Sequence, residues 1–330
     1  MAARRRVVTW SPSLTLVPTR GCFNACTYCS FRRAPGRDPW LSDQEAGALI
    51  EARPQALEVL MLSGEVDPEA AERPAWFARL KALSALALRT GRLPHTNAGP
   101  LSRAEMAALG RLNPSMGLML EGLGPAYDRA HQRAPSKTLS RRLGQLEQAG
   151  RLGIPFTTGL LLGLGETPRQ RREALELLAL LQRQWGHLQE VILQPWRPGA
   201  EAMQTASLST AEVDDVLLTI AEARQILPPE VHLQLPPNLW PAQHLIEALE
   251  AGIDDLGGID LADVINPRWP QPSPVELAEQ LQQAGWELRP RLCVHDGWIA
   301  GLPARLRARV QLLRRRLQAG PESGLLASAN

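Results

Sequence analysis

Short apolar segments recur along the 330-residue chain, and each is followed by a stretch with helical periodicity. Seven of them occupy residues 13–19, 56–64, 92–99, 115–122, 154–163, 188–196 and 230–238, and an eighth is expected at Leu261 to Ile265. Apolar runs that alternate with helices predict βαβ units and a parallel sheet buried on both faces. Seven or eight such units favour a closed (β/α)8 barrel, with an open doubly wound sheet as the alternative.

No internal stretch of the chain has the composition of a linker, so we predict a single barrel domain over residues 13–312. Residues 1–12 are expected to form an N-terminal tail. Residues 313–330 are expected to be the end of a basic helix and a frayed tail.

The charge balance and the absence of long apolar runs limit the function classes. The formal net charge is +2, which does not call for a nucleic-acid partner. No apolar run is long enough to span a bilayer, and no signal-peptide segment follows the basic N-terminus. We therefore expect a cytoplasmic protein that binds neither nucleic acid nor membrane.

Three of the four cysteines, Cys22, Cys26 and Cys29, form a C-x3-C-x2-C pattern directly after the first apolar run. In a reducing compartment such cysteines are more often metal ligands or catalysts than disulfides. A structural zinc site would need a fourth ligand, and the next histidine is His95. A four-iron cluster held by three thiolates leaves one iron free to bind a small molecule. Cys293 is expected to be a small buried hydrophobe.

This cysteine pattern, with the aromatic Tyr28 just before the last cysteine, resembles the radical S-adenosylmethionine (SAM) superfamily. The resemblance implies a 4Fe–4S cluster on Cys22, Cys26 and Cys29. The amino and carboxylate groups of SAM would bind the open iron. Reductive cleavage of SAM would then give a 5′-deoxyadenosyl radical that abstracts hydrogen from a substrate. A chance cysteine group or a zinc loop is the alternative.

Two further motifs resemble SAM-contacting motifs of that superfamily: "SGE" after the second apolar run and "GLLLGLGET" in and after the fifth. A carboxylate, Glu121, ends the fourth run. The resemblance implies that SAM contacts Tyr28 and the residues of these motifs: Ser63, Gly64, Glu65, Glu121, Gly159, Gly163 and Glu166. An ordinary βα turn at residues 63–65 and a rim carboxylate paired with an arginine at Glu121 are the alternatives.

Longer segments resemble one family within the superfamily, the CofG subunits of FO synthase, where FO is 7,8-didemethyl-8-hydroxy-5-deazariboflavin. The segments include "PHTNAGPLSRAEMAALGRLNPSMGLMLE", "HLQEVILQPWRP" and "AGIDDLGGIDLADVINPRWPQP". The resemblance implies a carbon–nitrogen lyase that closes the deazaflavin ring with loss of ammonia. Its small-molecule substrate would come from a partner subunit, CofH, and an external donor would supply electrons.

Polar residues near the carboxyl ends of the predicted strands are candidates for substrate binding and proton transfer. The candidate substrate contacts are Thr96, Asn97, Gln194 and Asn238. His95, Asp254 and Asp255 are candidate acid/base groups, expected at the barrel mouth. A hydrogen-bonded rim histidine and turn-capping aspartates are the alternatives.

Two other functions remain open from the residues alone. One is a different radical SAM reaction of the biotin synthase, hydrogenase-maturase or menaquinone-pathway kind. A biotin synthase-like enzyme would need more cysteines for an auxiliary cluster, which Cys293 alone cannot hold. The other is a metal-stabilised binding module without catalysis.

Overall fold

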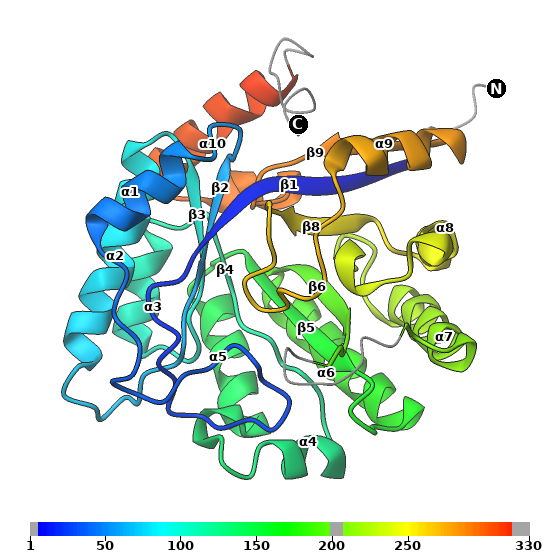
Figure 1. Ribbon diagram of the computed structural model, residues 1–330, viewed down its shortest axis with the longest axis horizontal. Coiled ribbons are helices and arrows are strands. Elements are labelled where there is room, and N and C mark those ends of the chain that lie inside the picture. The colour runs from blue at the N-terminus through cyan, green and yellow to red at the C-terminus, as the bar shows by residue number, and fades with distance from the viewer. Residues whose placement is uncertain (1–5, 199–206, 319–330) are drawn as a thin grey trace.

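In the computed structural model of the chain, which describes residues 6–198 and 207–318, eight parallel strands close into a barrel (Figure 1). The strands are β1 (Arg6–Leu16), β2 (Glu58–Leu62), β3 (Leu93–Asn97), β4 (Ser115–Gly117), β5 (Phe156–Leu162), β6 (Leu188–Pro195), β7 (His232–Gln234) and β8 (Asp255–Ile259). The barrel closes because β1 pairs with both β2 and β8. The predicted (β/α)8 fold is therefore confirmed, and the open sheet is excluded.

Each of the seven predicted apolar runs overlaps one strand, but the eighth strand was placed wrongly. The strand is Asp255–Ile259, whereas Leu261 is 68% exposed in the loop that follows. Three of the five residues of β8 are two glycines and an aspartate, so the strand does not read as an apolar run. A side chain at Gly258 would place its Cβ 2.6 Å from Ser13 Oγ, so close packing against β1 explains this glycine.

Strand β1 begins at Arg6, inside the range that was predicted to be a tail. Residues Arg6 to Trp10 pair in parallel with a ninth strand, β9 (Trp286–Pro290), and Val8 and Trp10 are buried. The boundary at residue 12 is therefore wrong. The preceding arginines and the charged residues of β9 masked this pairing in the sequence.

Helices surround the barrel, and the main core lies between them and the strands. The helices are α1 (Asp43–Glu51), α2 (Arg73–Arg89), α3 (Arg103–Gly110), α4 (Pro125–Ala130), α5 (Leu139–Arg151), α6 (Pro168–Trp185), α7 (Thr210–Ile226), α8 (Leu245–Ala251), α9 (Pro274–Gln283) and α10 (Ala304–Gln318). Capping boxes at Ser42, Ser102 and Thr167 satisfy backbone N–H groups at three helix starts. In the described part of the chain, no helix has the length and apolar character to cross a membrane.

The segment after β9 closes the barrel at the amino ends of its strands. The Cys293 carbonyl accepts hydrogen bonds from Ser115 at the start of β4 (2.7 Å) and from Gln189 near the start of β6 (3.0 Å). Cys293 itself is buried in an apolar cluster with residues of α10, as predicted. A ligand must therefore enter from the opposite end, where the cysteine loop follows β1.

Candidate active site

The three cysteines lie on the loop between β1 and α1, at the carboxyl end of the barrel. Backbone hydrogen bonds hold this loop to two neighbouring elements: Phe23 N–H donates to the Glu65 carbonyl (3.0 Å), and Thr27 N–H donates to the Ala130 carbonyl (3.1 Å). Cys26 is buried, Cys22 and Cys29 are half-buried, and all three are free thiols. One loop thus presents three thiols at the end where parallel-barrel active sites form.

The three thiols do not form a compact single-ion site in the described part of the chain. Zinc binds sulfur at about 2.3 Å, which brings tetrahedral ligands within roughly 4 Å of one another. Among residues 6–198 and 207–318, the three cysteine sulfurs do not form a group with all ligand atoms within 4.8 Å of one another. Burial raises the pKa of Cys26 to about 12, opposed by Lys137, so this thiol is protonated until a metal replaces its proton.

Glu65 is buried beneath the cysteine loop and bonds to three elements. It accepts hydrogen bonds from Asn24 of the loop (2.9 Å), from Arg142 of α5 (2.7 Å) and from Ser136. Burial alone would raise the pKa of Glu65, but Arg142 and Lys137 outweigh it and lower the pKa to about 2. The carboxylate is therefore ionised and fastens the loop to α5. Its predicted contact with SAM stays a prediction.

The other two residues of the "SGE" motif have clear packing roles. The Ser63 hydroxyl accepts from Trp76 Nε1 (3.0 Å) and donates to the Gly64 carbonyl (2.9 Å). A Cβ on Gly64 would lie 2.2 Å from the Gly21 carbonyl oxygen. Glycine is required here because the end of β2 touches the backbone of the cysteine loop.

Glu121 combines strain, burial and an unused oxygen. Its φ is 73°, in the left-handed region that non-glycine residues rarely adopt. One carboxylate oxygen pairs with Lys137, and the other is buried without a hydrogen bond, 3.5 Å from His131 Nε2. The same His131 nitrogen lies 3.0 Å from the Tyr28 hydroxyl. Burial would raise the pKa of Glu121, yet Lys137 outweighs it and the pKa is lowered to about 2. The Glu121 carboxylate is therefore ionised and can accept a hydrogen bond near Tyr28.

The fifth-strand motif is built around close backbone contacts. A Cβ on Gly159 would lie 2.5 Å from the Ile192 carbonyl oxygen, and Gly163 has a φ of 97°. The Glu166 carboxylate accepts from the backbone N–H groups of Gly163 (2.8 Å) and Leu164 (2.9 Å) and pairs with Arg171. Glu166 therefore shapes its own loop, Gly159 permits the close approach of Ile192, and Gly163 permits the left-handed backbone.

Side chains alternate along β3, so the predicted pocket residues of this strand lie on two different faces. A Cβ on Gly117 would lie 3.0 Å from His95 Nε2 and 3.8 Å from Asn97 Cβ, so these two side chains share the inner face. Thr96 points outward and donates to Asn113 Oδ1 (2.8 Å), which in turn bonds to Ser84 of α2. The expected place of Thr96 in the pocket is therefore wrong.

The remaining two pocket candidates lie in different settings. Gln194 is half-buried on the same face of β6 as Glu190, which reaches the barrel interior. Asn238 lies in a short 3-10 helix (Pro237–Leu239) after β7 and donates to Asp263 (2.9 Å) and to the Trp269 carbonyl (3.0 Å). Gln194 thus faces the barrel interior, whereas the Asn238 amide nitrogen is already used by the loop after β8.

The two candidate aspartates lie at the amino end of the barrel, not at its mouth. Asp254 precedes β8 and bonds to His232 Nδ1 (3.0 Å), and Asp255 is the first residue of β8. In a parallel barrel the residue that begins a strand lies on the edge away from the active-site loops. Their predicted position is therefore wrong, and no contact in the described residues links them to the cysteine loop.

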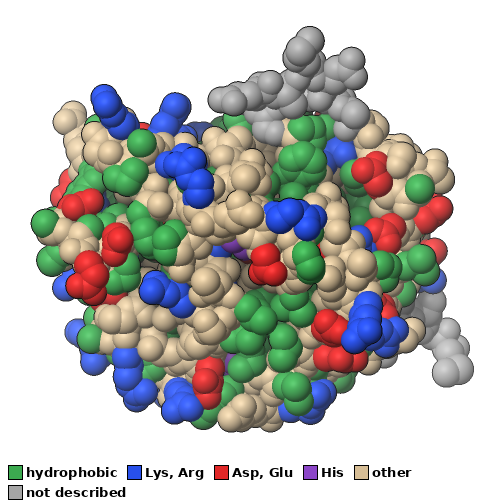
Figure 2. Space-filling model, turned by 90° about the horizontal axis from the view of Figure 1, so that it is seen from below, with side chains coloured by type: hydrophobic (Ala, Val, Ile, Leu, Met, Phe, Trp, Pro, Cys, Tyr) green, Lys and Arg blue, Asp and Glu red, His purple; other side chains and the backbone are tan. Residues whose placement is uncertain are grey.

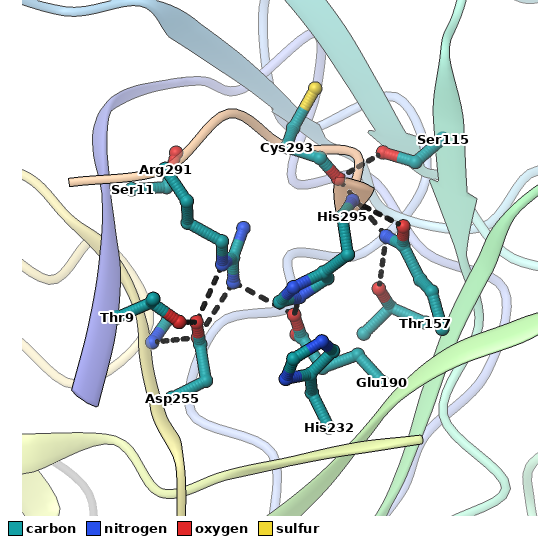
Figure 3. A network of polar contacts seen from close by, with 12 residues as sticks. Thr9, Ser11, Ser115, Thr157, Glu190, His232, Asp255, Arg291, Cys293 and His295 are labelled. Carbon is teal, nitrogen blue, oxygen red and sulfur yellow. Dashed lines mark hydrogen bonds and ion pairs between the residues drawn. The ribbon is translucent and has the colours of Figure 1, made fainter. Parts of the chain in front are cut away.

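Asp255 belongs to a buried polar network that fills the amino end of the barrel (Figure 3). Arg291 lies between Asp255 (2.5 and 2.6 Å) and Glu190 (2.7 Å), and His295 Nε2 is 2.9 Å from Glu190. His232 stacks on His295 with ring centroids 3.8 Å apart. Because the Arg291 guanidinium already joins both carboxylates, this group does not offer an open metal site.

Three buried carboxylates, Glu58, Glu190 and Asp255, surround this one guanidinium. Burial raises the pKa of Glu190 to about 8, although Arg291 opposes that change. Burial also raises the pKa of Glu58. Asp255 was among the predicted site residues, whereas Glu58 and Glu190 were not, although each is the single charged residue of its strand.

Comparison with known proteins agrees with this geometry. The Radical SAM superfamily model matches residues 16–178. The chain is 53% identical over 309 residues to a 7,8-didemethyl-8-hydroxy-5-deazariboflavin synthase of Synechococcus elongatus, covering 92% of this chain and 91% of that protein. It is 50% identical over 310 residues to the synthase of the same name from Thermosynechococcus vestitus, covering 93% and 98%.

Solved structures with low identity share the fold. The FeFe-hydrogenase maturase HydG from Carboxydothermus hydrogenoformans superposes with a TM-score of 0.70 at 19% identity, over 96% of this chain and 79% of that one. Methylornithine synthase (PylB) superposes with a TM-score of 0.61 at 15% identity, over 86% and 83%. At these identities the likeness concerns the barrel alone.

Proposed function

Because this chain belongs to the family of 7,8-didemethyl-8-hydroxy-5-deazariboflavin (FO) synthases within the radical SAM superfamily, we propose that it closes the deazaflavin ring of FO. Its substrate is the hydroxybenzyl–ribitylimino–dihydrouracil adduct that CofH makes, and ammonia is lost as the ring forms. The reaction class is a carbon–nitrogen lyase. The observation that carries the proposal is the loop of Cys22, Cys26 and Cys29 at the open end of a barrel with a polar interior.

The cysteines of this loop would bind the cluster, and residues around the loop would bind SAM. Cys22, Cys26 and Cys29 would hold a 4Fe–4S cluster, which together with SAM supplies the 5′-deoxyadenosyl radical. The free oxygen of Glu121 would accept a hydrogen bond from the SAM ammonium group. Lys137 keeps this carboxylate ionised, and Tyr28 adds an aromatic edge near it.

The neighbours of His95 determine its tautomer, in which Nδ1 carries the proton and Nε2 can accept a hydrogen bond. The Ser115 hydroxyl donates its one proton to the Cys293 carbonyl (2.7 Å), so it must accept from His95 Nδ1 (2.7 Å). Burial, with the nearby Arg291, lowers the pKa of His95 to about 3, so the ring is neutral at pH 7. Nε2 thus carries a lone pair on the inner face of β3, and no described residue bonds to it.

Ring closure must deliver a proton to the departing amine and remove one elsewhere. The neutral imidazole of His95 can accept a proton at Nε2. Glu58, like Asp255, is the first residue of its strand and lies beside Arg291 at the closed amino end of the barrel, so it is given no part in proton transfer.

An anaerobic assay with two matched cysteine variants tests the proposal. The protein is reconstituted with iron and sulfide and then given dithionite, SAM and the CofH product made in the same tube. We expect deazaflavin fluorescence and 5′-deoxyadenosine by mass spectrometry. Cys26→Ala should abolish both, whereas Cys293→Ala should retain the cluster because that thiol is buried far from the loop.

The outcomes separate the remaining alternatives. Deoxyadenosine without fluorescence would keep a radical SAM enzyme but assign it another substrate. A reconstituted cluster that gives neither signal would favour a binding role. Cluster loss in Cys293→Ala but not in Cys26→Ala would overturn the assignment of the iron ligands.

A further inference from the structure

The polar side chains inside the barrel differ in how completely they are hydrogen-bonded. At the closed amino end, Gln189 donates to the Cys293 carbonyl and accepts from the His295 backbone N–H (3.0 Å each). The Gln234 side chain of β7, in contrast, forms no hydrogen bond with any residue in 6–198 or 207–318, although it is only 9% exposed. Buried amides in native proteins are nearly always hydrogen-bonded, so an unpaired one indicates a ligand.

The Gln234 side chain points into the barrel. Its neighbours Leu233 and Leu235 belong to the main core between the strands and the helices, and successive side chains of a strand point to opposite faces. In the register of β6 and β7, Gln234 lies two residues beyond the pair of Glu190 and His232, toward the open end. The amide therefore lies one layer above the polar network of Figure 3.

Close packing against β8 fixes the place of this amide. A Cβ on Gly257 would lie 2.1 Å from Gln234 Nε2, and Gly257 has a φ of 75°. A larger residue at position 257 would displace the Gln234 side chain. Packing rather than hydrogen bonding thus holds the amide, and both of its polar atoms can bind a ligand.

Inward-facing glycines leave room for a flat ligand beside Gln234. Most (β/α)8 barrels fill their interior with bulky branched side chains. Here Gly117, Gly159 and Gly257 stand at inward positions on β4, β5 and β8, and Gly159 pairs with Ile192, which pairs with Gln234. Figure 2 views the molecule from the side of the cysteine loop, and a histidine side chain is visible in a hollow near the middle of that face.

The place of Gln234 and the chemistry of its side chain favour the substrate over SAM. The residues that the family motifs assign to SAM follow β1, β2, β4 and β5, whereas Gln234 belongs to β7. A carboxamide presents a donor and an acceptor side by side. The pyrimidine ring of the adduct presents the complementary pair, the N3–H beside a carbonyl, whereas ribityl hydroxyls and the phenol are single groups.

We propose that Gln234 binds the pyrimidine ring of the substrate, with Oε1 accepting from the ring N3–H and Nε2 donating to a neighbouring ring carbonyl. The inference deepens the proposed function and rests on it, since that function supplies the pyrimidine. On β6, Gln194 lies two residues nearer the open end than the partner of Gln234 and is left for other parts of the adduct. Two parallel hydrogen bonds fix the orientation of the ring, so that the bond-forming atoms face the cysteine loop.

Binding of a stable fragment of the substrate tests this assignment. The probes are 6-ribitylaminouracil and its N3-methyl derivative, which lacks the ring N–H. Their dissociation constants are measured by isothermal titration calorimetry on the anaerobically reconstituted enzyme with SAM present. Gln234→Met keeps the length of the side chain and removes both hydrogen-bonding groups, and Gln225→Met makes the same change at an exposed position of α7.

The expected result is a discrimination between the probes that depends on Gln234. N3-methylation should raise the dissociation constant for the wild type by about 10-fold or more. Gln234→Met should bind the unmethylated probe about 10- to 100-fold more weakly and should bind both probes within about twofold of each other. Gln194→Met should keep the discrimination, and Gln225→Met should match the wild type for both probes.

Several results would overturn the proposal. The wild type would bind both probes equally or bind neither, or the discrimination would persist in Gln234→Met. Its loss in Gln194→Met instead would assign the ring to that residue, and a parallel loss of SAM affinity in Gln234→Met would assign the amide to the adenine. The comparison of probes on the wild type needs no variant, so it decides even if Gln234→Met misfolds.

The binding test is independent of FO formation. Synthesis of FO without discrimination between the probes would refute the role of Gln234 alone. Discrimination without FO synthesis would refute ring closure and leave a pyrimidine site.

Discussion

Removal of the Arg142 guanidinium should destabilise the protein far more than a typical substitution on the same helix. Arg142 is buried in α5, and its Nη2 lies 2.7 Å from Glu65 Oε1. Substitution of Arg142 by Met keeps the length of the side chain and removes its charge. Glu65 would then be a buried carboxylate with only Lys137, 4.0 Å away, as a cationic neighbour.

Two independent arguments give the size of the effect. Breaking a buried ion pair by removal of one partner costs about 3–5 kcal/mol. The pKa of Glu65, lowered from its ordinary 4.5 to about 2 despite burial, corresponds to roughly 3 kcal/mol of favourable interaction with its charged form, shared between Arg142 and the other partners. We therefore expect Arg142→Met to lower the free energy of unfolding by about 3 kcal/mol.

Urea unfolding of the apo protein, followed by tryptophan fluorescence and circular dichroism under reducing conditions, measures this change. Arg151→Met is the matched control, because Arg151 lies on the same helix and its pair with Glu147 is exposed. An exposed pair of this kind contributes at most about 1 kcal/mol. The double variant Arg142→Met with Glu65→Gln should recover part of the loss, since it removes the stranded charge.

A stabilising role of the buried pair would be refuted if Arg142→Met lowered the free energy of unfolding no more than Arg151→Met does. It would also fail if the double variant were less stable than Arg142→Met alone. Iron content after reconstitution adds a second readout, because Glu65 also binds Asn24 of the cysteine loop. Loss of the pair should reduce the iron retained.

Further substitutions and an acid titration follow from the same contacts. Gly64→Ala should abolish iron binding because its Cβ would meet the loop backbone at 2.2 Å, whereas Gly144→Ala, in open space on α5, should keep it, as iron analysis will show. His95→Asn should slow FO formation by roughly 100-fold at unchanged iron content, measured by fluorescence. Since burial lowers the pKa of His95 to about 3, the unfolded state binds its proton first, so stability should begin to fall below about pH 6.5 and continue to about pH 3 in acid unfolding curves.

The sequence predicted the barrel because its strands are buried on both faces and read as continuous apolar runs. Strand β5, all seven residues of which are buried, is the clearest case. The apolar pattern did not reveal β8, where Gly258 packs closely against Ser13 of β1 and Gly257 has a φ of 75° beside Gln234 of β7. The start of β1 was not apparent either, because the pairing of Arg6–Trp10 with β9 joins segments about 280 residues apart. Local patterns carry no information on such contacts.

The cysteine site could be predicted because its residues lie within eight positions of one another. The outward orientation of Thr96 could also have been found, since His95 and Asn97 must share the face opposite to it. Arg142, Arg291 and Lys137 could not be assigned, because each acts on a residue brought to it only by the folded barrel.

The pairing of β1 with β8 and β9 has a consequence for biosynthesis. The cysteine loop leaves the ribosome well before β9, so the strand before it gains its last partner only when Trp286–Pro290 has been made. At roughly 5–20 residues per second, about 270 further residues take on the order of 15–50 s. For nearly all of that interval the barrel cannot close, because β8 (Asp255–Ile259), which joins it to β1, has not yet been made. The closed barrel that surrounds the three cysteines is therefore complete only after most of the described chain has been synthesised.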